Sequence, residues 1–72
     1  MEHYQKLLND AQINYEHKAE YFETMKIQKE RGVITELELR QAQLVFEESK
    51  SIVSNYKDII WYYQWLSNLI VD

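Results

Sequence analysis

The sequence favours an all-α fold, namely an antiparallel two-helix coiled-coil hairpin. Its 72 residues contain no proline and one glycine, Gly32, so the turn residues that a multi-stranded β fold needs are missing. On both sides of Gly32, apolar residues recur in steps of three and four, which is the spacing of one helical face. The stretch between the two periodic segments is so short that the helices must lie side by side and antiparallel.

A first helix is predicted over residues 2–31. Basic residues gather in its last turns, at Lys26, Lys29 and Arg31, where cations interact favourably with the negative end of the helix dipole. Gly32 follows, at the position where helices commonly end in a left-handed backbone conformation. The apolar face of this helix is expected to consist of Tyr4, Leu8, Ala11, Tyr15, Ala19, Phe22 and Met25.

The turn is predicted over residues 32–35, and Thr35 is expected to begin the second helix as its N-cap. Thr35 and Glu38 have the Thr-x-x-Glu spacing of a capping box, in which each side chain accepts a hydrogen bond from the other residue's backbone N–H. Val33 and Ile34 are apolar although they lie in a tight turn. Two interpretations remain open: Ile34 packs on the second helix as a hydrophobic staple, or the turn is an exposed apolar tip that contacts a partner.

A second helix is predicted over residues 36–70. Its apolar face is wide, because two rows of apolar residues lie next to each other. A two-stranded coiled coil needs only a narrow seam, so we expect this helix to contact two or more neighbours, through self-association or in a larger helical array. The main seam is expected at Ala42, Val45, Ser49, Ile52, Tyr56, Ile59, Tyr63, Leu66 and Ile70, and the parallel row at Leu39, Phe46, Val53 and Ile60.

The C-terminal third of the second helix is apolar on all sides. Trp61 and Trp65 are spaced by one helical turn and point away from the expected seam. A helix that is apolar all round is normally buried, which favours a core extended by homo-oligomerisation; a ligand pocket or a site for another partner is the alternative. The residues expected in the oligomer interface are Phe46, Val53, Ile60, Trp61, Trp65 and Leu69.

Charge and residue types argue against catalysis, a cofactor, a metal site and nucleic-acid binding. The formal net charge is −4, whereas nucleic acids and anionic membranes select basic surfaces. Cysteine is absent, which excludes a disulfide, a thiolate ligand and a thiol nucleophile. His3 and His17 would lie about 21 Å apart along a helix, so they cannot share a metal ion. We therefore expect a non-enzymatic protein that needs no cofactor.

No membrane-spanning helix and no targeting signal are expected in this chain. A spanning helix needs about 20 apolar residues, and no such stretch is present. The first residues lack the basic start and the apolar run of a secretory signal. The chain is expected to be a single helical hairpin, residues 1–72, that is a fragment of a larger protein.

The residues around the turn resemble a pattern found in TolC-type outer-membrane efflux channels. That family has a glycine, a small hydroxyl residue three positions on, an acidic–aliphatic pair and then Ala-Gln. Lys29 departs from the pattern, because the family often has an aromatic residue before the glycine. The matching residues are Gly32, Thr35, Glu38, Leu39, Ala42 and Gln43, followed by Asn55 and Tyr56 and by the closing leucines Leu66 and Leu69.

The resemblance implies a structural and docking role. Channels of this family are homotrimers with a β-barrel in the outer membrane and a long α-helical barrel in the periplasm. This chain would be one hairpin of the helical barrel, in the periplasmic part of the protein, with its turn at the periplasmic tip. There it would dock against the hairpin of a periplasmic adaptor protein in a tripartite export pump. The tip residues expected to bind the adaptor are Arg31, Gly32, Val33, Ile34, Thr35 and Glu38.

The alternative is an independent small helical hairpin that acts as a homo-oligomeric scaffold or as a regulatory interaction module. Its apolar surface would then be covered by further copies of the same chain, as a dimeric four-helix bundle or a larger assembly.

Overall fold

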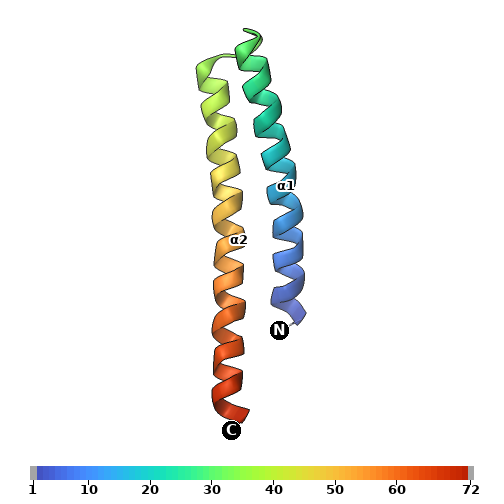
Figure 1. Cartoon of the computed structure of the whole chain (residues 1–72), viewed down its shortest axis with the longest axis vertical. Helices are drawn as coiled ribbons and strands as arrows, with labels where there is room; N and C mark the ends of the chain where they lie inside the picture. Colours follow the sequence, from blue (N-terminus) through green and yellow to red (C-terminus); the bar gives the residue numbers. More distant parts are fainter. Residues whose placement is uncertain (1, 72) are drawn as a thin grey trace.

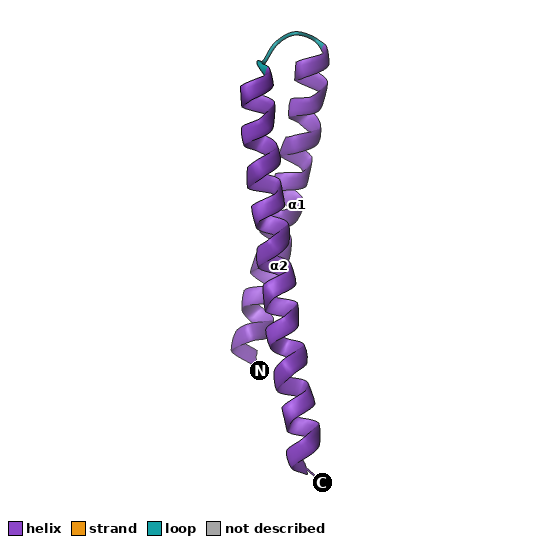
Figure 2. Cartoon of the chain, turned by 90° about the vertical axis from the view of Figure 1, so that its left-hand side faces the viewer, coloured by secondary structure: helices purple, strands orange, loops and turns teal. Residues whose placement is uncertain are grey.

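Two antiparallel helices of unequal length make up the computed structural model, which describes residues 2–71 (Figure 1). Helix α1 spans Glu2–Glu30 and helix α2 spans Glu36–Val71. The molecule is a rod of 61 × 15 × 13 Å, and a view turned by 90° shows the two helices crossing at a shallow angle (Figure 2). The predicted all-α hairpin is confirmed, with its helix ends within one residue of those expected from the sequence.

The contact face of α1 is the one that the sequence pattern predicts. Leu8 and Met25 are buried, and the other five residues of the expected face are half-buried. The steps of three and four bring these side chains onto one stripe, because an α-helix completes a turn every 3.6 residues. The exposed apolar residues of α1, which include Ile13 and Ile27, lie off this stripe.

The contact face of α2 differs from the expected seam, and here the prediction is wrong in part. Val45 and Ile52 were expected to face α1, but they are 42% and 40% exposed. The observed seam instead combines all four residues of the parallel row with every second residue of the expected main seam, so that it again advances in steps of three and four. Its members, from the turn downwards, are Leu39, Ala42, Phe46, Ser49, Val53, Tyr56 and Ile60, all buried or half-buried.

The core of the hairpin is thin. Leu8, Val53 and Ile60 form its buried cluster, and four half-buried residues, Tyr4, Ala11, Tyr15 and Tyr56, pack against it. Even the best buried of the described side chains retain some exposure: none falls below 2%. Two helices can cover only one side of each other, so a chain of this size has a small margin of stability.

Aromatic rings strengthen the middle and the open end of the hairpin. The Phe46 ring of α2 stacks on two rings of α1, with centroid distances of 5.5 Å to Tyr15 and 5.4 Å to Phe22. Near the open end, the Tyr4 and Tyr63 rings stack at 5.5 Å. Ser49, the polar member of the seam, donates its hydroxyl hydrogen bond to the Phe46 carbonyl oxygen at 2.6 Å, so its burial leaves no unpaired polar group.

We expect Phe46→Ala to lower the free energy of unfolding by about 2–3 kcal/mol, because it removes a half-buried ring from between two others. Urea unfolding followed by circular dichroism, at one fixed chain concentration, would measure the change. Leu44→Ala is the matched control, since Leu44 is on the same helix but 69% exposed. Equal effects of the two substitutions would contradict the role given to Phe46.

Candidate functional site

The turn between the helices is closed by two complete capping motifs. On the α1 side, Gly32 has a φ of +74°, the left-handed conformation that the sequence predicts there. The Gly32 N–H donates to the Lys29 carbonyl oxygen at 3.0 Å, and the Val33 N–H donates to the Gln28 carbonyl oxygen at 2.8 Å. These two bonds make a Schellman motif, which satisfies carbonyl groups that the helix end would otherwise leave free.

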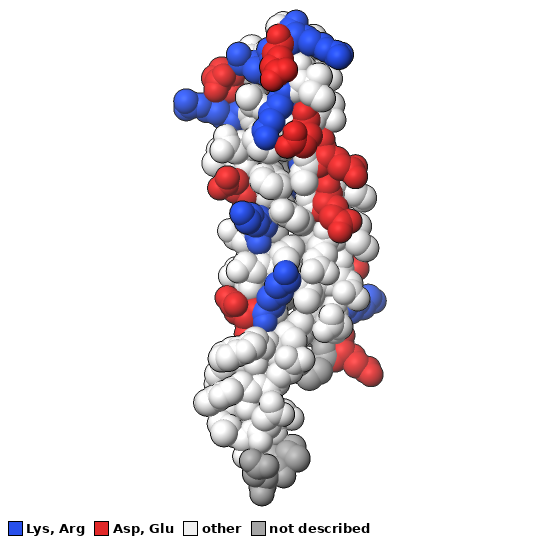
Figure 3. All heavy atoms as spheres, in the orientation of Figure 1, with Lys and Arg blue, Asp and Glu red and all other residues white. Residues whose placement is uncertain are grey.

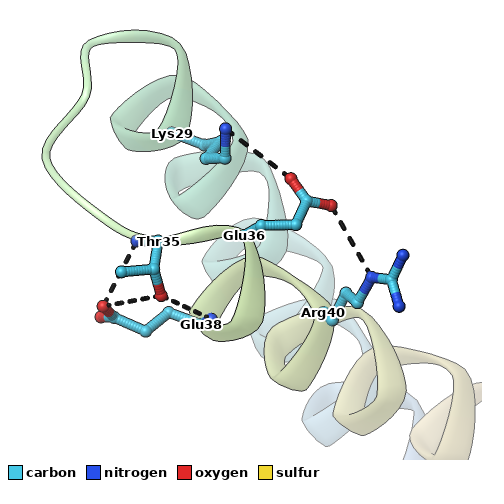
Figure 4. Close-up of polar contacts among 5 residues, drawn as sticks. All are labelled: Lys29, Thr35, Glu36, Glu38 and Arg40. Atoms are coloured by element: carbon cyan, nitrogen blue, oxygen red, sulfur yellow. Dashed lines mark hydrogen bonds and ion pairs between the residues drawn. The ribbon is translucent and has the colours of Figure 1, made fainter.

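On the α2 side, the predicted capping box is confirmed (Figure 4). The Glu38 N–H donates to Thr35 Oγ1 at 3.1 Å, and the Thr35 N–H donates to Glu38 Oε1 at 3.3 Å. The Thr35 hydroxyl also donates to Glu38 Oε1 at 3.2 Å. The Thr35 carbonyl accepts the first backbone bond of the helix, from the Leu39 N–H at 3.1 Å. The backbone of the turn is therefore held at both ends.

Glu36 makes two ion pairs beside the turn, one across to α1 and one within α2. Glu36, in the first turn of α2, lies 3.6 Å from Lys29 Nζ of α1 and 3.7 Å from Arg40 Nε (Figure 4). Glu36 and Arg40 are largely exposed and Lys29 is half-buried, so each pair contributes only a few tenths of a kcal/mol. Their charges also suit the helix dipoles, because Lys29 is in the last turn of α1 and Glu36 in the first turn of α2.

The two apolar residues of the turn, Val33 and Ile34, differ in exposure. Ile34 is half-buried, as a residue of a hydrophobic staple would be, whereas Val33 is 67% exposed. The remaining expected tip residues, Arg31, Gly32, Thr35 and Glu38, are exposed beside Val33. Together these six residues, which we call the tip, present one apolar side chain within a charged and polar rim.

The residues expected in an oligomer interface lie in two different places. Phe46, Val53 and Ile60 pack against α1 within the hairpin. Val53 and Ile60 retain only 8% and 7% exposure and Phe46 is half-buried, so these side chains already serve the contact between the two helices. This part of the prediction is corrected, because the seam of α2 runs through them. Trp61, Trp65 and Leu69 are exposed at the opposite end of the molecule from the tip.

We call residues 59–70 the aromatic tail. Figure 3 shows that charged side chains cover the body of the rod towards the turn, whereas the C-terminal end of α2 carries none on the face drawn. Helix α1 begins at Glu2, close to the level of Tyr63, so the last turns of α2 extend beyond it (Figure 1). The large exposed apolar side chains of the tail are Trp61, Tyr62, Tyr63, Trp65, Leu69 and Ile70.

A third exposed feature escaped the sequence prediction. Val45, Ile52, Ile59 and Leu66 recur every seventh residue, and they form a stripe along one flank of α2 that we call the flank stripe. Val45 and Ile52 are exposed, whereas Ile59 and Leu66 are half-buried. Near the tip this flank is hollowed between the helices, where Tyr21 and Met25 of α1 meet Ala42 and Val45 of α2. The spacing of seven was visible in the sequence, but it was assigned to the seam between the helices.

The remaining expectations from the sequence are that the chain has no metal site and no membrane-spanning helix. Residues 2–71 contain no group of three or more His, Asp or Glu side chains placed to hold a metal ion. His3 lies beside Tyr4, with ring centroids 5.5 Å apart. Within the same residues, neither helix has a stretch long and apolar enough to cross a membrane.

Comparison with known proteins gives no relative: no protein-family model, no curated protein and no solved structure matches this chain.

We expect Gly32→Ala to lower the free energy of unfolding by about 1 kcal/mol. A Cβ at this position would meet no atom within 4 Å, so the cost comes from the left-handed backbone alone. Gly32→Asn is the matched variant and should cost less, because asparagine tolerates this conformation better than alanine. Urea unfolding would rank the three chains, and an unchanged or raised stability of the alanine variant would contradict the assignment.

The contact of Tyr4 with Tyr63 is expected to weaken at alkaline pH. A hydrogen bond with Tyr63, together with repulsion between the two phenolates, raises the pKa of Tyr4 above its ordinary value of 10.0. The folded chain thus favours the neutral phenol, so this contribution to stability is complete below pH 10 and is lost as the pH rises through the raised pKa.

Circular dichroism from about pH 8 to about pH 12 would measure this loss as a fall in helicity. The fall should be smaller in Tyr4→Phe, whose ring cannot ionise. Tyr21→Phe, at an exposed position of α1, should behave like the parent chain. If the two variants gave the same profile, the contact of Tyr4 with Tyr63 would not be its cause.

Proposed function

We propose that this chain is a non-catalytic docking hairpin, and that its tip binds end-on to the helical hairpin of a periplasmic adaptor protein, as in TolC-type outer-membrane efflux channels. The observation that carries the proposal is the doubly capped turn that presents Val33 at the end of a long, two-helix rod. The turn residues are also those that resemble the family's pattern.

The geometry of the tip suits an end-on contact. A docking surface that is already ordered loses little conformational entropy on binding. The Schellman motif and the capping box fix the backbone on both sides of Val33, so this side chain is displayed in one position. An apolar residue within a polar rim has the arrangement of a small interface centre, in which the rim keeps water from the apolar contact.

The flanks of the rod are compatible with neighbours on its sides. Val45 and Ile52 of the flank stripe are exposed, and the hollow beside Tyr21 and Met25 continues this surface onto α1. In a helical barrel such a flank would be covered by the next hairpin. A protein of this kind would act in the periplasm as part of an outer-membrane assembly.

The second candidate is an independent homo-oligomeric scaffold. The same flank stripe favours it, because a row of apolar residues every seven positions is what a further helix of a bundle packs against. In this case the flank would be covered by another copy of the chain, and the tip would have no dedicated partner.

We expect Val33→Asp to weaken binding of the chain to a purified adaptor hairpin at least tenfold, because it places a charge at the centre of the docking surface. Sedimentation velocity with a labelled adaptor hairpin would measure the affinity. Leu44→Asp is the control, since Leu44 is equally exposed on α2 but lies outside the tip.

Equal affinities of the Val33 and Leu44 variants would exclude the tip as the docking surface. If the chain self-associates but binds no adaptor hairpin, the scaffold candidate is favoured instead.

A further inference from the structure

The aromatic tail is an extended apolar surface that the hairpin leaves uncovered. From residue 59 to residue 70 there is no charged side chain, and Trp61, Trp65 and Leu69 are 65%, 48% and 58% exposed. Tyr62 lies against Trp65, with ring centroids 6.5 Å apart, and is itself 51% exposed. An apolar patch of this kind on a helix usually marks a contact with another protein.

We propose that the aromatic tail binds the aromatic tail of a second copy of this chain, so that two hairpins join end to end as an antiparallel dimer with their tips at the far ends. The inference does not require the docking function of the tip. It gives the scaffold candidate a specific interface, at the end of the rod rather than on its flank.

The tail is complementary to itself. Trp61, Trp65 and Leu69 are spaced by four residues, so they lie on one face of α2. A twofold axis near Trp65 would set the two Trp65 rings against each other and each Trp61 against Leu69 of the second copy. Such a contact is isologous, which means that both chains use the same surface, so the assembly stops at two chains.

The exposed area is sufficient for a dimer of moderate affinity. At the observed exposures, Trp61, Tyr62, Trp65 and Leu69 offer roughly 500 Å² per chain, hence roughly 1,000 Å² for the pair, which is the lower bound for a specific interface. Tryptophan and tyrosine are also the residues that contribute most per contact at such interfaces. Interfaces of this small size are typically weak, so we expect a dissociation constant in the micromolar range or above.

Charge restricts where two copies of the chain can meet. The chain carries a net charge of −4, so two copies repel each other wherever their charged surfaces meet. The tail offers no charge that could select an oppositely charged protein. It is also the longest stretch of α2 without a charged residue, so the centre of a contact between two tails brings no like charges together. Along α2, the charged residue that precedes the tail is Asp58, one turn before Trp61.

The two tryptophans of the chain both lie in the tail, so intrinsic fluorescence reports directly on this contact. We expect the emission of the 72-residue chain to shift to longer wavelength on dilution through the micromolar range, in parallel with a fall from dimer to monomer in sedimentation equilibrium. Trp65→Glu should raise the dissociation constant at least about 30-fold. Leu44→Glu, a similar change at a more exposed site on α2, should leave it unchanged.

Introduced cysteines test the geometry, because the chain has none of its own. With the twofold axis near Trp65, two copies of residue 68 lie about 9 Å apart along the helix axis, too far for a disulfide. Asn68→Cys, in the tail, should therefore be linked into a dimer by a long bismaleimide reagent, whereas Val33→Cys, in the tip, should not. A chain that stays monomeric up to about 200 µM overturns the proposal. So does a dimer that cross-links only through Ile52→Cys, which would place the contact on the flank stripe. A monomer that binds zwitterionic lipid vesicles through its tryptophans would show that the tail docks on membranes instead.

Different variants test the dimer and the proposed docking function, so the failure of one can be told from the failure of the other. Val33→Asp should weaken adaptor binding and leave the dimer intact, whereas Trp65→Glu should dissociate the dimer and leave the tip intact.

Discussion

The whole molecule depends on one antiparallel contact between two helices. A helix that packs against a single neighbour can bury only one stripe of its surface, because the rest of its circumference faces away. In this hairpin the buried stripe of α2 is filled by Phe46, Ser49, Val53 and Ile60, and even there burial is incomplete. Helix α2 carries far more apolar surface than α1 can cover. Its exposed surfaces, the flank stripe and the aromatic tail, follow from this imbalance.

The parts of the fold that the sequence predicted correctly are those determined by neighbouring residues. The Schellman motif at Gly32 and the capping box of Thr35 and Glu38 involve residues that lie within a few positions of one another, so their spacing is sufficient to predict their hydrogen bonds. The face of α1 was predicted for a similar reason. This helix has a single apolar stripe, and only one side of it could face a partner.

The seam of α2 could not be predicted in the same way, and the expected oligomer interface was partly wrong as a result. Val45 and Ile52 are as apolar as Val53 and Ile60, and the two rows lie less than a quarter of a turn to either side of a common direction. The choice between them depends on where the rings of Tyr15 and Phe22 are placed by α1, which only the packed structure shows. The capped turn gives the backbone of the tip a fixed geometry. The affinity of the tip for a partner also depends on the partner's surface, which is not encoded in this sequence.

The antiparallel register also determines the order in which contacts between the two helices form. The pair formed by Lys29 and Glu36 closes a loop of a few residues, whereas the stack of Tyr4 on Tyr63 closes nearly the whole chain. Since the entropy lost in closing a loop grows with its length, contacts beside the turn form at the lowest cost, and each one shortens the loop that the next must close. We therefore expect the two helices to pair first beside the tip and last at the open end. Spontaneous opening follows the reverse order, so the two ends of the rod differ in lifetime as well as in chemistry: the tip is the persistent end, and the aromatic end is the one that frays.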